Sequence, residues 1–450
     1  MTTTAELAEF VRAVSFDEFS HDTREALKKR VLDSVGIGVA ALDSKPVAAV
    51  HRTVGRANGG DDCTLWGRDE TASLVGAAMH NTAATRYLDF MDSFLAPGET
   101  PHPSDNIGAV VAAAEYVDAS GRELLEGVGV AYEVQGELAW NAPVRDRGWD
   151  HVTHTVVSAA CGVAKLLDCD VETTRDAIGI AGTAHNALRV TRTGGINEWK
   201  GIASANAARN GAYAALLASD GTEGPRDLFE GQKGWKQVIS GEFDVALDPG
   251  CSRVHDVMTK RYVAETYAQS AVEGVVELAE REDIDGSEVD GIDLETFAGA
   301  KLIIGGGEGD RHVVETKAQA DHSLPYMLAA ALLDREMGTA QYEPDRIARE
   351  DVQSLLRTVT VAENDAFTER FEHGEMPARV TVELADGTTH VVEKDAFAGH
   401  PTDPMDWEQL ERKFHRTAGM RFDDDRRREV VEVVRDLESR DAADLVALLA

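Results

Sequence analysis

Residues 70–92, ETASLVGAAMHNTAATRYLDFMD, decide the fold class of the first half of the chain. Alanine and glycine dominate this stretch, and its apolar residues recur at helical rather than alternating spacing. Small side chains let neighbouring helices approach closely. We therefore predict a helix that lies at the centre of a helical domain and is buried there.

The same small-residue helical pattern continues on both sides of this stretch. Residues 22–42 read as a helix that opens with Asp22 paired with Glu25. Further helical stretches follow at 106–121, 124–140, 156–188 and 202–221, and no strand pattern occurs before about residue 236. The first half of the chain is therefore predicted to be all-helical.

The pattern changes after Lys260. Residues 267–284 and 320–338 look helical, whereas 289–304, 359–367 and 378–397 look like strands, with a D-G hairpin turn in the last stretch. From residue 406 the chain is helical again. We predict a mainly α protein with an all-helical domain (1–262), an inserted smaller α+β lid domain (263–398) and C-terminal helices (399–450) that rejoin the helical domain.

The charge balance is strongly acidic. The 450 residues include 80 Asp or Glu and 45 Lys or Arg, giving a formal net charge of -35. Such a field repels nucleic acid and anionic membranes, so neither is expected as a partner. The acidic residues are dispersed along the chain, which favours a protein from a high-salt cell, where salt screens charges beyond ~3 Å. An unusually acidic mesophilic protein is the alternative.

The cysteines and the amino terminus exclude several protein classes. Cys63, Cys161, Cys169 and Cys251 form no C-x-x-C pair, so we expect small buried side chains rather than a metal centre, a cluster or a disulfide framework. The run Gly305–Gly309 lacks the G-x-G-x-x-G spacing and is predicted to be an ordinary turn. The amino terminus lacks signal-peptide features and no stretch reaches about 20 apolar residues, which predicts a cytoplasmic protein.

The first candidate site residues fall in YLDFMDSFLAPGETPHPSDNIG, residues 87–108. His102 lies between two prolines, just before a predicted helix for which Ser104 or Asp105 would be the cap. A histidine in that position is suited to proton transfer beside a bound carboxylate. For Asp105 we prefer the simpler role of helix cap.

Three further segments carry candidate residues. In WDHVTH (149–154), His151 is a candidate for binding an anion rather than a metal, and His154 has an equal claim to be structural. Gly194 and Gly195 predict a flexible turn before Lys200, whose ammonium could project from a small-residue helix into a cavity; a solvated helix-face lysine is the alternative. Lys260 lies near the predicted domain boundary, and Tyr326 opens an apolar helix.

Taken together, these segments resemble the MmgE/PrpD family. HPSDNIG (102–108), WDHV (149–152), NEWKGIASANAARNG (197–211), GTEGPRDLFEG (221–231) and ADHSLPYMLAAALL (320–333) occur in the order that the family shows. The resemblance covers nearly the whole chain. It implies a helical domain with a smaller α+β lid, a homodimer, and chemistry next to a carboxylate of a small polycarboxylate substrate.

The resemblance also implies a set of site residues. Asp89, His102, Lys200 and Tyr326 match the catalytic positions of the family, and Ser93, His151 and Lys260 match substrate-binding positions. Ser93 stands where many relatives have threonine. Val263, three residues after Lys260, stands where relatives often have proline, which departs from the family pattern. No cofactor and no metal are implied.

Within the family, the sequence is most similar to the branch that dehydrates 2-methylcitrate during propionate breakdown. HPSDN and DHV carry that likeness, so a metal-independent hydro-lyase is expected. Decarboxylation of cis-aconitate and epimerisation of iminodisuccinate are alternatives from the same family. A non-catalytic helical scaffold is the alternative from a different class, and it would show an exposed apolar patch without a cationic pocket.

Overall fold

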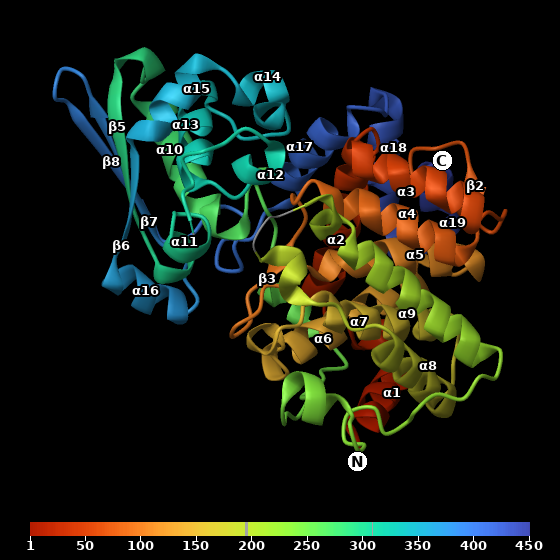
Figure 1. Cartoon of the computed structure of the whole chain (residues 1–450). Coiled ribbons are helices and arrows are strands. Elements are labelled where there is room, and N and C mark those ends of the chain that lie inside the picture. Colours follow the sequence, from red (N-terminus) through yellow and green to blue (C-terminus); the bar gives the residue numbers. More distant parts are fainter. Residues whose placement is uncertain (194–196, 308) are drawn as a thin grey trace. The chain divides into compact units, whose positions relative to one another are not determined.

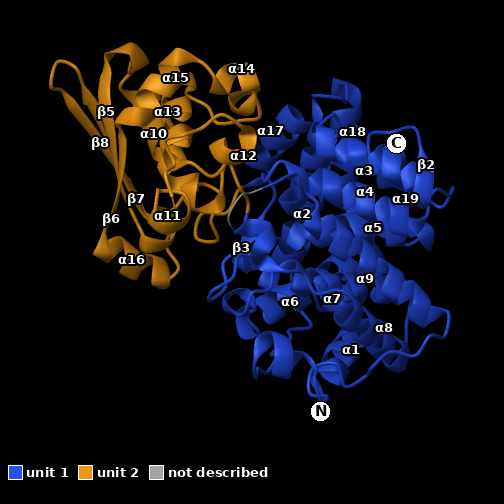
Figure 2. Cartoon of the chain, in the orientation of Figure 1, with its two compact units in different colours: residues 1–258, 406–450 blue, residues 259–405 orange. Residues whose placement is uncertain are grey.

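A computed structural model of the chain describes residues 1–193, 197–307 and 309–450. It divides into two compact units, coloured separately in Figure 2. The first comprises Met1–Met258 and Asp406–Ala450, and the second comprises Thr259–Met405. The turn predicted at Gly194 and Gly195 lies outside the described residues, and so does Glu308 in the run predicted to turn at Gly305–Gly309.

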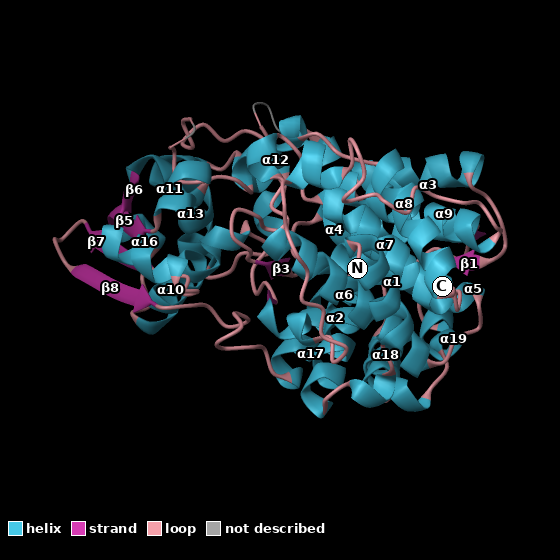
Figure 3. Ribbon diagram, turned by 90° about the horizontal axis from the view of Figure 1, so that it is seen from below, coloured by secondary structure: helices cyan, strands magenta, loops and turns pink. Residues whose placement is uncertain are grey.

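The first unit is built mainly from helices, as Figures 1 and 3 show. Its helices in the first half of the chain are α1 (Thr3–Ala13), α2 (His21–Ala41), α3 (Lys45–Ala57), α4 (Leu74–Tyr87), α5 (Ile107–Tyr116), α6 (Gly121–Asn141), α7 (Val152–Leu166), α8 (Val171–Ala184) and α9 (Ala203–Ser219). The stretch with which the sequence analysis began forms α4, and nearly all of its side chains are buried. The prediction of a buried central helix is confirmed.

Small residues allow these helices to touch through their backbones. A Cβ atom on Gly108 of α5 would lie 2.5 Å from the backbone nitrogen of Thr82 in α4. A Cβ on Gly211 of α9 would lie 2.6 Å from the carbonyl oxygen of Val156 in α7. Any larger side chain at either position would force the helices apart.

The start of α2 differs from its prediction. The helix begins at His21, and Ser20 is its cap, with an extended backbone and a side-chain oxygen that accepts from the Thr23 amide. The predicted pairing of Asp22 with Glu25 is wrong, because Glu25 instead accepts hydrogen bonds from Lys28 and the Trp407 indole. Serine precedes the helix by the right distance to satisfy an amide of the first turn.

Short strands occur earlier than predicted. β1 (Cys63–Thr64) pairs with β2 (Thr71–Ala72), and β3 (Ser93–Phe94) pairs with β4 (Val257–Met258), both antiparallel. Each strand has two residues, which is too short for an alternating pattern to be visible in sequence. The β3–β4 pair holds Ser93 beside a segment more than 160 positions away in the chain.

The C-terminal helices belong to the first unit. They are α17 (Trp407–Ala418), α18 (Asp424–Arg435) and α19 (Ala442–Ala447). The Nζ of Lys413 in α17 lies 2.7 Å from Oδ1 of Asp33 in α2 and donates to the Phe90 carbonyl at 3.1 Å. This buried ion pair ties α17 to both α2 and the segment that follows α4.

The second unit contains a four-stranded sheet in the order β6-β5-β7-β8. β5 (Val289–Thr296) runs parallel to β6 (Val359–Glu363) and antiparallel to β7 (Ala378–Leu384), and β7 pairs with β8 (Thr389–Lys394). The predicted hairpin is confirmed, with Gly387 at φ 87° in its turn. A left-handed backbone of this kind favours glycine.

Two of the predicted strands are shorter than expected. β5 ends at Thr296 and helix α11 (Ala298–Ile303) follows it, while β6 ends at Glu363 and α16 (Asp365–Glu372) follows. Asn364 caps α16 by accepting from two backbone amides, which ends the strand. The other helices are α10 (Gln269–Arg281), α12 (Lys317–Ala320), α13 (Leu324–Asp334), α14 (Pro344–Ile347) and α15 (Glu350–Leu355).

The predicted fold class, mainly α with a smaller α+β unit, is confirmed. All four cysteines are free and buried. Within the described ranges, every helix is too short or too polar to cross a membrane.

Candidate active site

His102 lies at the start of a short 3-10 turn, Pro103–Asn106, that precedes α5. Its Nδ1 is 2.7 Å from the backbone carbonyl oxygen of Asp92 and 3.2 Å from the hydroxyl of Ser93. Because a carbonyl can only accept, Nδ1 must donate to it, and this assigns the ring proton to Nδ1. In its neutral form the ring therefore carries its lone pair on Nε2.

Asp92 fixes the segment that holds His102. Its Oδ1 accepts from the amide of Ser104 at 3.1 Å and from the Ser104 hydroxyl at 2.7 Å. Its Oδ2 accepts from the Tyr132 hydroxyl at 2.7 Å. A buried carboxylate with three donors is well satisfied, so the turn that carries His102 is rigid. Asp92 falls within the first candidate segment, residues 87–108, but the sequence gave no signal for this role.

The predicted cap of α5 is wrong. The helix begins at Ile107 after Asn106, and no side chain caps it. Ser104 is engaged with Asp92, and both carboxylate oxygens of Asp105 have no hydrogen-bond partner in the described part of the chain. The two prolines that flank His102 favour a 3-10 turn before the helix, and this turn shifts the helix start past both predicted caps.

Asp105 is instead a fully buried carboxyl group. Burial raises the pKa of Asp105 to about 7, and the Arg86 guanidinium, whose Nε is 3.9 Å from Oδ1, only partly offsets this. Near neutral pH the group is therefore close to half protonated. A buried acid of this kind makes the folded state bind more protons than the unfolded chain.

We expect Asp105→Asn to stabilise the protein more at pH 8 than at pH 5. The raised pKa means that the folded wild type loses stability as the pH rises from about 4 to about 7, and asparagine removes that loss. The gain at pH 8 should exceed the gain at pH 5 by about 1–3 kcal/mol. Guanidinium unfolding at fixed potassium chloride measures both values, and equal gains at the two pH values would contradict the buried-acid assignment.

Lys200 and Asp89 form a second part of the cluster. Lys200 lies in the 3-10 turn Glu198–Gly201 just before α9, and its Nζ is 3.2 Å from Oδ2 of Asp89. The other oxygen of Asp89 is 3.4 Å from Nη1 of Arg86. Asp89 has a left-handed backbone, with φ 56°, after the end of α4. Backbone conformations of this kind are concentrated at functional sites.

His151 belongs to this cluster and His154 does not. The rings of His102 and His151 form an edge-on pair with centroids 5.4 Å apart. His154 places Nε2 2.9 Å from the carbonyl oxygen of Ala142 and packs against Trp235. Burial lowers the pKa of His154 to about 4, so it acts as a neutral structural donor.

Arg192 lies beside His151 and was not among the predicted site residues. Its Nε donates to Oδ2 of Asp150 at 2.6 Å, and its Nη2 is 3.4 Å from Nε2 of His151. Burial lowers the pKa of His151 well below its ordinary value, and the Arg192 charge lowers it further. An arginine in an acidic chain, three residues after Arg189, gave no distinguishing pattern in sequence.

The two remaining predicted residues lie in the second unit. Lys260 follows β4 and is almost fully buried. Tyr326 lies in the first turn of α13, where its hydroxyl donates to the Gln341 carbonyl and burial raises the pKa of its phenol. Their roles at the site stay predictions. Within the described residues, no group of three or more His, Cys, Asp or Glu is arranged to hold a metal ion.

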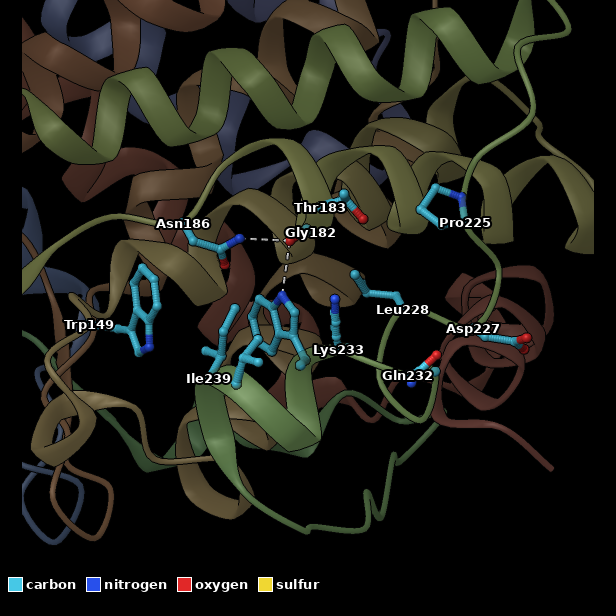
Figure 4. Close-up of a pocket in the computed structure, with 14 residues that line it drawn as sticks. Trp149, Gly182, Thr183, Asn186, Pro225, Asp227, Leu228, Gln232, Lys233 and Ile239 are labelled. Carbon is cyan, nitrogen blue, oxygen red and sulfur yellow. Dashed lines mark hydrogen bonds between the residues drawn. The ribbon is translucent and has the colours of Figure 1, made fainter.

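A pocket of about 360 Å³ lies elsewhere in the first unit (Figure 4). Trp149 and the end of α8 line one part of it, and residues 225–239 line the rest. The Gly182 carbonyl accepts from the Trp235 indole and from Asn186, both at 2.9 Å. Asp227 and Lys233 are the charged residues among those that line it, and no histidine is among them.

Comparison with known families matches both parts of the chain. The model of the MmgE/PrpD N-terminal domain matches residues 5–248, and that of the MmgE/PrpD C-terminal domain matches residues 262–439. The chain belongs to the MmgE/PrpD family. The family resemblance inferred from the five sequence segments is therefore confirmed.

Several characterised MmgE/PrpD proteins are similar over most of their length. A 2-methylcitrate dehydratase from Cupriavidus necator is 30% identical over 342 residues, which span 70% of this chain and 68% of the relative. The 2-methylcitrate dehydratase of Escherichia coli K12 is 28% identical, over 80% and 78% of the two chains. A cis-aconitate decarboxylase from Mus musculus is 25% identical, over 94% and 88%.

Proposed function

We propose that this protein is a hydro-lyase that removes water from 2-methylcitrate to give 2-methylaconitate, without a metal ion. The observation that carries the proposal is the arrangement around His102. Its Nδ1 is committed to the Asp92 carbonyl, so that Nε2 bears the lone pair, in a buried cluster that also holds His151 and the Lys200–Asp89 pair. The dehydratase relatives supply the substrate class.

The reaction needs one base and one acid. The base breaks a C–H bond next to a carboxylate, the electron pair forms the carbon–carbon double bond, and the C–O bond breaks as the acid protonates the departing hydroxide to water. His102 performs one of these proton transfers, a role that contributes about 10²–10⁴-fold to the rate. Lys200 stabilises the enolate-like charge that grows as the proton leaves.

The remaining predicted residues complete the proposal. Ser93 supplies a hydroxyl beside His102, at 3.2 Å from Nδ1. Lys260 holds a substrate carboxylate and Tyr326 takes part in proton transfer, as the family resemblance implies. We further propose that the enzyme is a cytoplasmic homodimer adapted to high salt, in line with its formal charge of -35.

The direct test is ultraviolet absorbance of the purified protein in molar potassium chloride with EDTA. With 2-methylcitrate, we expect absorbance to rise as the conjugated double bond forms, and chelation should leave the rate unchanged. Citrate serves as the comparison substrate. A rate that EDTA abolishes and iron restores would contradict metal-independent dehydration.

Decarboxylation of cis-aconitate is the second candidate. The mouse cis-aconitate decarboxylase matches a larger share of this chain than either dehydratase described above, although at lower identity. Release of carbon dioxide from cis-aconitate, without any absorbance rise from 2-methylcitrate, would replace the dehydratase proposal with this one.

A further inference from the structure

A buried ion pair between Asp150 and Arg192 lies beside His151. Asp150 is fully buried, and its Oδ1 accepts from the amide of Val152 at 3.1 Å while its Oδ2 accepts from Arg192 Nε at 2.6 Å. The Arg192 side chain is 11% exposed. The carboxylate thus fixes the plane and direction of the guanidinium.

Both partners of this pair are held in their charged forms. Burial by itself would raise the pKa of Asp150, but the adjacent Arg192 charge lowers it well below its ordinary range. Burial would lower the pKa of Arg192, but Asp150 keeps it raised. A buried arginine held in this way is a permanent cation in a chain whose overall charge is strongly negative.

The Arg192 guanidinium has more N–H donors than its contacts with the described residues use. Arginine carries five N–H donors. Among the described residues, Arg192 donates only from Nε to Asp150 and from Nη2 to His151, at 3.4 Å. The second bond also assigns His151: because arginine can only donate, Nε2 of the ring accepts and Nδ1 carries the proton, facing Asp150 at 3.5 Å. His151 is therefore neutral, and the positive charge here belongs to Arg192.

Lys200 is a second cation in the cluster. Lys200 is 3.2 Å from Asp89, and the Asp89 charge contributes to the raised pKa of Arg192. Arg86, which lies 3.4 Å from Asp89 and 3.9 Å from Asp105, connects the Lys200 pair to the segment that carries His102. The His102 ring in turn packs against His151, beside Arg192. Such an arrangement suits a ligand that carries at least two carboxylates.

We propose that Arg192 binds a substrate carboxylate, with Asp150 orienting it, and that Arg192 and Lys200 together select small di- and tricarboxylates. The inference rests on the proposed function for the identity of the substrate, but the binding role can be tested without turnover. Neutral His151 then supports the arginine and is not itself the charged ligand.

The test measures binding of tricarballylate, a tricarboxylate without a hydroxyl group that cannot be dehydrated. In calorimetry in molar potassium chloride, Arg192→Met should raise its Kd about 10- to 100-fold, the loss expected for a charged hydrogen bond. Arg192→Lys keeps a charge beside Asp150 but loses the planar guanidinium. Its Kd should therefore lie between those of the wild type and Arg192→Met. Arg428→Gln, which changes an exposed arginine that pairs with Asp425 on α18, is the control and should bind like the wild type.

A second readout follows the ionisation of His151. The charged and titratable groups around its ring are Asp150, Arg192, Arg86, His154 and His102. Loss of the Arg192 charge leaves Asp150 next to the ring, so in Arg192→Met the pKa of His151 should rise toward its ordinary range. Histidine NMR signals between pH 5 and 8 report this shift. In Arg192→Lys, which keeps the charge, the pKa of His151 should rise less than in Arg192→Met.

The outcomes separate the two proposals. Tight tricarballylate binding with no dehydration of 2-methylcitrate would remove the proposed reaction and keep Arg192 as a carboxylate ligand. Equal Kd values for the wild type and a folded Arg192→Met or Arg192→Lys would overturn the role of Arg192. A wild type that does not bind tricarballylate would overturn the polycarboxylate site itself.

Discussion

Replacing His102 by asparagine is expected to lower kcat for dehydration about 10²–10⁴-fold while the protein stays folded. The asparagine amide can still donate to the Asp92 carbonyl, which the histidine Nδ1 reaches at 2.7 Å. It has no titratable nitrogen in place of Nε2, so proton transfer is lost and positioning is kept. The rate is measured by the absorbance of the product in molar potassium chloride.

Two controls make the His102 result specific. His51→Gln changes a histidine that pairs with Glu70 at the surface, at 3.2 Å, and should keep the wild-type rate. The Kd for tricarballylate should change little in His102→Asn, because the lost group moves a proton and does not carry a permanent charge. A kcat within a few-fold of wild type would rule out His102 as the proton-transfer residue.

The helical architecture was predictable because it depends on short-range patterns. Apolar spacing located α4 and its neighbours, and the abundance of small residues anticipated the close approach at Gly108 and Gly211. The turn at Gly387 was visible for the same reason, since a hairpin of two alternating strands has a local signature.

Helix ends and strand ends were less predictable because several residues compete for each role. Ser20, and not Asp22, caps α2, and Asp105 caps nothing. A single sequence offers Ser, Asp and Asn at neighbouring positions, and only the backbone path decides which of them reaches an unpaired amide. Two-residue strands such as β3 are defined by a distant partner and leave no periodic signal.

The candidate site likewise contains residues that the sequence predicted and residues that it did not reveal. His102, Ser93 and His151 fall into one buried cluster, and Lys200 pairs with Asp89, as their joint selection anticipated. Asp92 and Arg192 were not among the predicted site residues because their placement depends on contacts across 40 or more positions, with Tyr132 and Asp150. Such contacts follow from the packing of α6 and α7 and have no local pattern.

Replacing Lys200 by methionine is expected to lower kcat about 10²–10³-fold, the loss typical of removing one group that stabilises developing negative charge. Methionine keeps most of the length of the side chain and removes the ammonium group with its charge. Asp89 keeps Arg86 as its partner at 3.4 Å, so the fold should survive. Lys200→Arg should retain part of the activity, because it keeps the charge but changes its position.

The control for Lys200 is Lys45→Met, which removes an exposed lysine that pairs with Glu198, two residues before Lys200. It should leave the rate unchanged, since exposed pairs of this kind contribute little.

The decisive quantity for Lys200 is how the effect of its loss divides between kcat and KM. If Lys200 stabilises the enolate-like transition state, its loss lowers kcat, whereas loss of Arg192 weakens ground-state binding and mainly raises KM. The same division in both variants would mean that the two cations act as one carboxylate clamp and that the growing charge is stabilised by another group.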